Sequence, residues 1–94
     1  MGWSQVKPKV IQALKDGTFQ HEARREIATK NLLQMGDVTA DEIAQVLRTA
    51  RGTDHRTDPH HNDPGIDVNI VTHKGWYIKF YFADPDTIFI SVHK

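Results

Sequence analysis

The stretch GWYIKFYFADPDTIFISVHK, residues 75–94, decides the fold. Successive side chains of a strand point to opposite faces of a sheet, so alternating apolar residues predict a strand with one buried face. The run from Trp76 to Phe82 alternates in this way, and a second run follows the turn at 84–86. The side chains predicted to share the apolar face are Trp76, Ile78, Phe80, Phe82, Ile88, Ile90 and Val92. The stretch therefore predicts an antiparallel β-hairpin that covers a core with one face.

The other face of this hairpin carries the first candidate site. Pairing Phe82 with Ile88 brings both apolar sets to the same side of the sheet. The pairs that follow are Phe80 with Ile90, Ile78 with Val92, Tyr81 with Phe89, Lys79 with Ser91, and Tyr77 with His93. A phenol and an imidazole thus become cross-strand neighbours. One face of an antiparallel sheet is often only solvated, so this polar face is either a site or an ordinary surface.

A third strand is predicted to precede the hairpin. The β-branched residues Val68 to Thr72 run up to a turn that ends at Gly75. If Val68 and Ile70 join the apolar face, Asn69 lies beside Tyr77 on the polar face.

Three helices are predicted before the strands. The first contains Pro8 in its first turn and stops at Gly17, and the second spans Gln20 to Met35. The third begins at the capping box Thr39-Ala40-Asp41-Glu42, in which the Thr hydroxyl and the Glu carboxylate satisfy free backbone amides reciprocally. This order predicts a single α+β domain, with the helices packed on one face of an antiparallel sheet of about three strands. Its parts are a helical region 1–52, a polar loop 53–65 and a sheet 66–94, all within one domain over 1–94.

Composition excludes several classes of function. The 94 residues contain no Cys, so the fold uses neither a disulfide nor a thiolate zinc site. Twelve basic and twelve acidic residues cancel, which is not the strongly basic pattern of a protein that binds duplex nucleic acid. No apolar run is long enough for a membrane span or a signal peptide, so we expect a cytoplasmic protein without a membrane partner.

The polar loop offers a metal site as an alternative. His55, His60 and His61, together with nearby carboxylates, are ligand types that zinc or nickel accepts. Adjacent histidines rarely bind one ion together, however, and no helix-borne motif accompanies them. We therefore favour a loop that closes over a substrate, with Arg56 and His55 reaching it, and expect no metal.

A second cluster lies at the start of the predicted helix over 20–35. His21 shares a helical face with Arg24 or with Arg25, and either pair forms a small anion-binding edge if no acid intervenes. Glu22 and Glu26 lie between and after them, so a solvated face of mixed charge is the favoured interpretation.

The polar face of the hairpin has the groups that cleave RNA without a metal. One group takes the proton of the ribose 2′-hydroxyl, another protonates the leaving 5′-oxygen, and a cation stabilises the phosphate. His93, Tyr77 and Lys79 supply these groups. Histidine suits acid–base work near neutral pH, and a tyrosine orients a phosphate or stacks on a base.

Short strings along most of the chain also resemble a known family. They are Ser4-Gln5-Val6-Lys7, the stop at Gly17, Asp67-Val68, Gly75 followed by Tyr77-Ile78-Lys79, and Ile90-Ser91-Val92. In these strings and in the order of its elements the chain resembles the MqsR family, the mRNA-cleaving toxins of bacterial toxin–antitoxin modules. The pair His21 and Arg24 before a capped helix is similar to other small toxin-like domains of the broader RelE superfamily.

This resemblance implies a RelE-like fold and an endoribonuclease that needs no cofactor. Tyr77 falls on the family's catalytic Tyr, and His93 falls where the family has a catalytic Lys. Ile66 replaces a Gln of the family, and only Arg51 or Arg56 could replace its Lys after the third helix. The resemblance also implies mRNA or tRNA as substrate and an antitoxin or immunity protein as partner, with the ribosome as a further candidate.

The sequence as a whole favours a small bacterial endoribonuclease toxin with His93, Tyr77 and Lys79 as catalytic residues. The residues expected to bind RNA or its phosphates are Arg51, Arg56, His55, Ser91, Asn69 and Arg24. The alternative is a module that binds RNA or protein on the same open face without turnover. A metal-binding histidine loop is a weaker third hypothesis.

Overall fold

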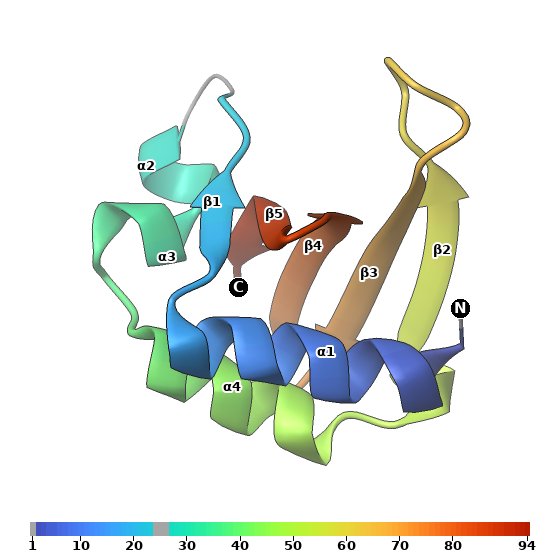
Figure 1. Cartoon of the computed structure of the whole chain (residues 1–94). Coiled ribbons are helices and arrows are strands. Elements are labelled where there is room, and N and C mark those ends of the chain that lie inside the picture. Colours follow the sequence, from blue (N-terminus) through green and yellow to red (C-terminus); the bar gives the residue numbers. More distant parts are fainter. Residues whose placement is uncertain (1, 24–26) are drawn as a thin grey trace.

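The computed structural model describes residues 2–23 and 27–94, which form an α+β fold with helices on one face of a five-stranded sheet (Figure 1). The helical elements are α1 (Trp3–Asp16), α2 (Ile27–Lys30), α3 (Leu32–Met35), α4 (Ala40–Thr49) and the 3₁₀ turn η1 (Gly52–Asp54). The strands are β1 (Phe19–His21), β2 (His55–Pro59), β3 (Asp67–His73), β4 (Trp76–Ala83) and β5 (Asp86–His93). The predicted α+β class is confirmed.

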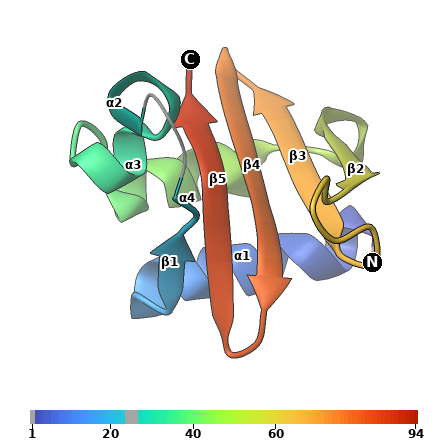
Figure 2. The same ribbon diagram turned by 90° about the horizontal axis from the view of Figure 1, so that it is seen from above.

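The sheet has the order β1-β5-β4-β3-β2, with β1 parallel to β5 and every other neighbouring pair antiparallel. Figure 2 shows the sheet in front of α1 and α4, so these two helices cover one face, whereas α2 and α3 lie to the side, next to β5. The other face of the sheet is free of helices. The prediction of about three strands missed the two outer ones. β2 lies in the segment predicted as a polar loop, and β1 lies at the start of the segment predicted as the second helix.

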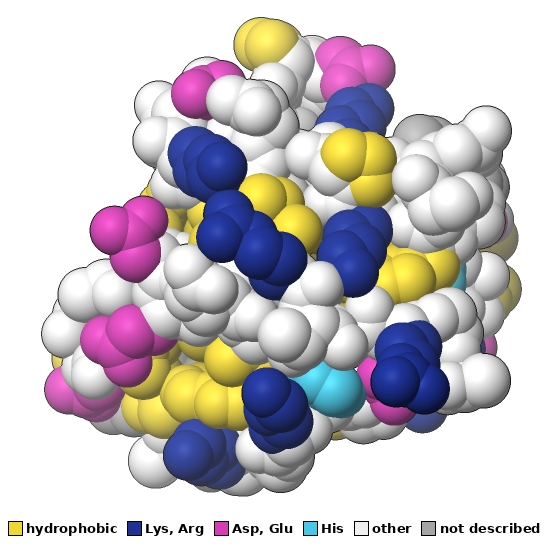
Figure 3. Space-filling view, turned by 90° about the horizontal axis from the view of Figure 1, so that it is seen from below, with side chains coloured by type: hydrophobic (Ala, Val, Ile, Leu, Met, Phe, Trp, Pro, Cys, Tyr) yellow, Lys and Arg dark blue, Asp and Glu magenta, His cyan; other side chains and the backbone are white. Residues whose placement is uncertain are grey.

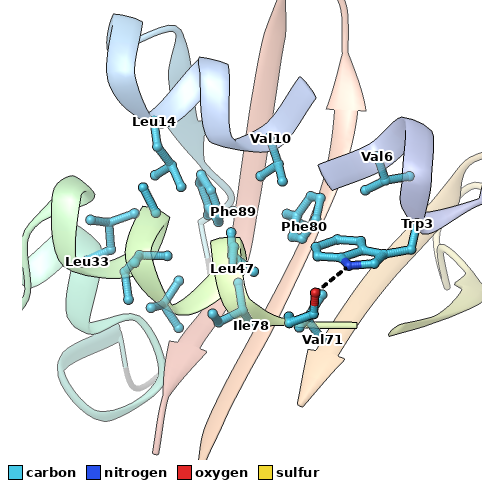
Figure 4. Packing of buried hydrophobic residues seen from close by; sticks show 14 residues of the cluster. Trp3, Val6, Val10, Leu14, Leu33, Leu47, Val71, Ile78, Phe80 and Phe89 are labelled. Carbon is cyan, nitrogen blue, oxygen red and sulfur yellow. Dashed lines mark hydrogen bonds between the residues drawn. The ribbon is translucent and has the colours of Figure 1, made fainter. Parts of the chain in front are cut away.

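The core lies between the sheet and the pair α1 and α4. Trp3, Val10 and Leu47 are buried there, and the indole Nε1 of Trp3 donates to the Ala50 carbonyl at 3.0 Å (Figure 4). That bond ties the first residue of α1 to the C-terminal end of α4. Pro8 lies inside α1 rather than in its first turn, because the helix begins earlier than predicted.

The capping box of α4 forms as predicted. The Thr39 hydroxyl accepts from the Glu42 backbone N–H at 3.1 Å, and the Glu42 carboxylate accepts from the Thr39 backbone N–H at 3.3 Å. Together they satisfy backbone donors that the first turn of a helix leaves free. The start of α4 is therefore fixed by local chemistry that the sequence alone reveals.

The predicted helix over residues 20–35 is wrong. The described part of this segment contains β1 and then the two four-residue helices α2 and α3. Asn31 separates the two: its side-chain oxygen accepts from the Gln34 N–H, which caps α3, and its amide donates to Nδ1 of His21 at 3.0 Å. Asn31 is 0% exposed, so these bonds have no competition from water. A buried side-chain cap thus restarts the helix where apolar spacing alone predicts continuity.

The hairpin follows the predicted register only at its open end. Tyr77 pairs with His93 and Lys79 with Ser91, but a β-bulge follows, after which Phe80 pairs with Phe89 instead of Ile90. A bulge sets two residues of one strand against one of the other. Phe89 therefore enters the main core, and Ile90 turns to the helix-free face.

The side chains of β3 point to the opposite faces of the sheet from those predicted. Val71 pairs with Ile78 and faces the helices, whereas Val68 and Ile70 form a small second cluster with Ile90 on the helix-free face. The cause is the tight turn at Lys74 and Gly75, both with positive φ (52° and 80°). A two-residue turn fixes the hairpin register, and a shift of one residue moves every side chain to the other face.

The partly buried imidazole of His21 makes stability depend on pH. Burial lowers the pKa of His21 from its ordinary value of 6.5, so the folded protein binds fewer protons at this site than the unfolded chain does. The stability from the neutral ring is present above about pH 6.5 and is lost as the pH falls from there through the lowered pKa. We expect the urea midpoint to fall between about pH 7.5 and about pH 5.5, and to fall less in His21→Gln. Equal pH dependence in parent and variant would contradict this assignment.

Candidate functional site

The middle strand of the helix-free face, β4, carries Tyr77, Lys79 and Tyr81 on that face. The rings of Tyr77 and His93 stack, with centroids 5.2 Å apart and planes at 22°. The predicted neighbourhood of these two side chains is therefore confirmed. Nδ1 of His93 lies 3.2 Å from the Lys94 carbonyl oxygen, and because that oxygen only accepts, the neutral ring carries its proton on Nδ1. Its Nε2 then holds a free electron pair.

Lys79 is the cation of this face that lies beside the Tyr77–His93 pair. It pairs with Ser91, which is buried. Within residues 2–23 and 27–94, neither the Lys79 ammonium nor the Tyr77 hydroxyl has a hydrogen bond or ion pair. A lysine without an acidic partner beside a stacked phenol–imidazole pair is able to receive an anion.

A second polar cluster lies farther along β4, and the sequence did not predict it. Glu22, which follows β1, accepts from Nε2 of His60 at 2.9 Å and from the Tyr81 hydroxyl at 3.3 Å, both on Oε1. His60 belongs to the loop after β2 and is 6% exposed. Burial, and then the charge and hydrogen bond of Glu22, raise the pKa of Tyr81, so its hydroxyl stays protonated and donates.

Lys79, together with Glu22 and His60 of the second cluster, lines a cavity of about 430 Å³ on the helix-free face. Its lining includes Glu22 from beside β5, His60 and His61 from the loop after β2, and Lys79 from β4. The rings of His60 and His61 stack with centroids 5.3 Å apart. Tyr77, Lys79 and Tyr81 are two residues apart along β4 and share one face of the sheet. Lys79 therefore lies between the Tyr77–His93 pair and the Glu22 cluster.

Two of the expected RNA-binding residues lie elsewhere. His55 and Asn69 face the helices, where Nε2 of His55 and Oδ1 of Asn69 are 2.9 Å apart and the His55 ring stacks on Trp3. Asn69 pairs with Phe80 and is buried, so its predicted place beside Tyr77 is wrong and Thr72 takes that place. These side chains join β2 and β3 to α1 rather than contact a substrate.

The arginines expected to bind phosphate are distributed over the molecule. Arg56 pairs with Ile70, so it lies on the helix-free face, exposed, with Nε 3.9 Å from Oδ2 of Asp58. Arg51 lies between α4 and η1, in the helical layer, and does not join the face. Arg24 lies outside the described residues, and His21, its predicted neighbour, turns to Phe19 and Phe89 instead.

The histidines of the polar loop do not gather around one point. His55 is at the start of β2 and His60 follows its end. In the described part of the chain, no group of three or more His, Asp or Glu side chains is arranged to hold a metal ion. The histidine-loop hypothesis therefore gains no support from the geometry.

The helical side has a mixed surface. Seen from that side, Lys and Arg side chains share the surface with Asp, Glu and hydrophobic side chains (Figure 3). This mixture agrees with the equal numbers of basic and acidic residues. None of the described helices is both long and apolar enough to cross a membrane.

The chain has no match among known protein families, curated proteins or solved structures. The resemblance to the mRNA-cleaving toxins therefore stays a prediction.

Proposed function

We propose that this protein is a small endoribonuclease that cleaves RNA without a metal on its helix-free face. The observation that carries the proposal is Lys79, a cation without a partner in the described chain, next to the stacked Tyr77–His93 pair. Acid–base chemistry on a phosphodiester needs a base, an acid and a cation in one place. These three side chains are the catalytic residues predicted from the sequence.

The reaction follows from the chemistry of each group. Nε2 of His93 takes the proton of the ribose 2′-hydroxyl, and the 2′-oxygen then attacks the adjacent phosphorus. The bond between phosphorus and the 5′-oxygen breaks, and the Tyr77 hydroxyl donates a proton to that oxygen as it leaves. Lys79 stabilises the extra negative charge on the phosphate oxygens. The products are a 2′,3′-cyclic phosphate and a free 5′-hydroxyl.

The biological setting in this proposal is that of a bacterial toxin that acts in the cytoplasm. An antitoxin or immunity protein would neutralise it, and mRNA or tRNA would be its substrate, free or on the ribosome. Zero net charge gives little general attraction to RNA, so selection of the substrate would come from local contacts on this face.

A metal-free cleavage assay tests the function. We expect the parent protein, incubated with total RNA in excess chelator or with translating ribosomes in Mg²⁺ buffer, to produce new ends that carry 2′,3′-cyclic phosphate and 5′-hydroxyl groups. Sequencing by ligation methods specific for these ends maps the cuts. RNA that is bound but never cut, with or without ribosomes, would overturn the proposal in favour of a binding module.

A further inference from the structure

The carboxylate of Glu22 is held in a fixed position inside the cavity, yet the proposed reaction does not use it. Both of its bonds, from His60 Nε2 and from the Tyr81 hydroxyl, go to Oε1. His60 is itself fixed, because its Nδ1 accepts from the Asn62 backbone N–H at 3.1 Å. Oε2 of Glu22 has no bond to any other described residue. A buried histidine and a tyrosine thus orient a carboxylate whose second oxygen remains able to accept.

Charge decides what kind of group this cavity takes. Glu22 and Asp58 both contribute carboxylates to its lining, and Lys79 is the one Lys or Arg among its described lining residues. An anionic group is repelled near Glu22 and attracted near Lys79. The part of a ligand that reaches Glu22 is therefore neutral and bears N–H donors, while its phosphate stays at Lys79.

The mixed polar and apolar lining of the cavity suits a nucleobase. Val68 and Ile90 are both buried and form part of an apolar lining, and the rings of His60 and Tyr81 pack edge to face beside them. The volume of about 430 Å³ lies within the usual range of small-molecule sites. A nucleobase has apolar faces and a polar edge, and it matches a cavity in which apolar side chains lie beside an oriented carboxylate.

We propose that this cavity is a guanine subsite, in which N1–H and N2–H of the base next to the scissile phosphate both donate to Oε2 of Glu22, the oxygen left free by His60 and Tyr81. Guanine is the one RNA base with two adjacent donors, N1–H and N2–H, on its Watson–Crick edge. Adenine, cytosine and uracil place an acceptor next to their donor, and that acceptor would face the carboxylate. The choice of RNA as the source of the base rests on the proposed function, whereas binding of the base does not require cleavage.

The position of Lys79 connects the subsite to the reaction. Lys79 lines the cavity and is also the neighbour of the Tyr77–His93 pair along the sheet. A phosphate on Lys79 therefore has the cavity on one side and the acid–base pair on the other. A guanine in the cavity belongs to the nucleotide at the cut, so guanine should be enriched at one position beside each cleavage point.

Binding of mononucleotides to the whole chain tests the subsite without any cleavage. We expect GMP to bind about ten- to hundredfold more tightly than AMP, CMP or UMP in titration calorimetry. IMP lacks the 2-amino group and should bind more weakly than GMP. Glu22→Gln should lose the preference for GMP, because its side-chain NH₂ brings a donor where the carboxylate accepts. Asp41→Asn, which removes an exposed carboxylate from α4, is the matched control and should bind as the parent does.

The outcomes separate the two sources of guanine and the two proposals. A preference for GMP with cuts next to guanosine supports the RNA subsite. The same preference with cuts that ignore guanosine, or with no cuts, overturns the RNA assignment and leaves a site for a free guanine nucleotide. Equal binding of the four nucleotides, or binding of none, overturns the guanine subsite even if RNA is cleaved. If Glu22→Gln fails to fold, the comparison of GMP with IMP on the parent decides.

Discussion

His93→Ala is expected to cleave RNA about two to four orders of magnitude more slowly than the parent, which is the range for loss of an acid–base group. The reason is the free Nε2 of His93, which lies beside Tyr77 and next to the cation that would hold the phosphate. The measurement is the initial rate on one defined RNA, in chelator, with enzyme in excess. A variant that folds by circular dichroism and cleaves at the parental rate would remove His93 from the reaction.

Lys79→Ala tests the role of the cation in the cleavage rate, with Lys15→Ala as the matched control. Lys15 lies exposed in the last turn of α1, on the helical layer, so Lys15→Ala removes the same charge far from Lys79. Lys79→Ala should lose most of the activity, and Lys15→Ala should keep it. Equal losses in both variants would show that overall charge, rather than the position of Lys79, governs the rate.

The sequence predicted the open end of the hairpin correctly for a simple reason. Near His93 the residues alternate clearly, since Ser91 is polar between the apolar Ile90 and Val92. Farther along, Ile88, Phe89 and Ile90 are all apolar, so nothing in the pattern marks which face each one takes. The bulge after Lys79 lies beside this unmarked run, and alternation alone could not reveal it.

The outer strands escaped prediction because they bury little. Four of the five residues of β2 are exposed, so it has no apolar alternation, and Pro59 at its end is typical of an edge strand. β1 has three residues and forms by pairing with β5, which is distant in the sequence. Local patterns carry no information about such pairing.

The Glu22 cluster was missed for the same reason. Glu22 and His60 are 38 residues apart, and they meet because β1 and the loop after β2 both border the helix-free face. One signal was available: Tyr81 shares the period-two face of Tyr77 and Lys79, which makes it a member of the same polar row. The row on β4 was thus predictable from the sequence. The side chains that complete the site around this row were not.

Phe89→Ala is expected to lower the free energy of unfolding by about 3 to 5 kcal/mol, the usual cost of removing a buried phenylalanine ring. Phe89 is 0% exposed and its ring contacts the rings of Phe19 and Phe80, at centroid distances of 5.6 and 5.7 Å. A domain of this size commonly has a free energy of unfolding of only about 5 to 15 kcal/mol, so the variant is expected to be only marginally stable. Urea unfolding followed by circular dichroism measures the loss.

Ile88→Ala is the matched comparison, because it tests the register as well as the core. The register predicted from alternation buries Ile88 under the helices and turns Phe89 away, whereas the bulge places Phe89 in the core and Ile88 opposite Tyr81. With the bulge, Ile88→Ala costs less than about 2 kcal/mol, well below Phe89→Ala. A larger loss of unfolding free energy for Ile88→Ala than for Phe89→Ala would favour the register without the bulge. That register would also move Ile90 out of the cavity lining, and the subsite proposed beside Glu22 would lose part of its apolar wall.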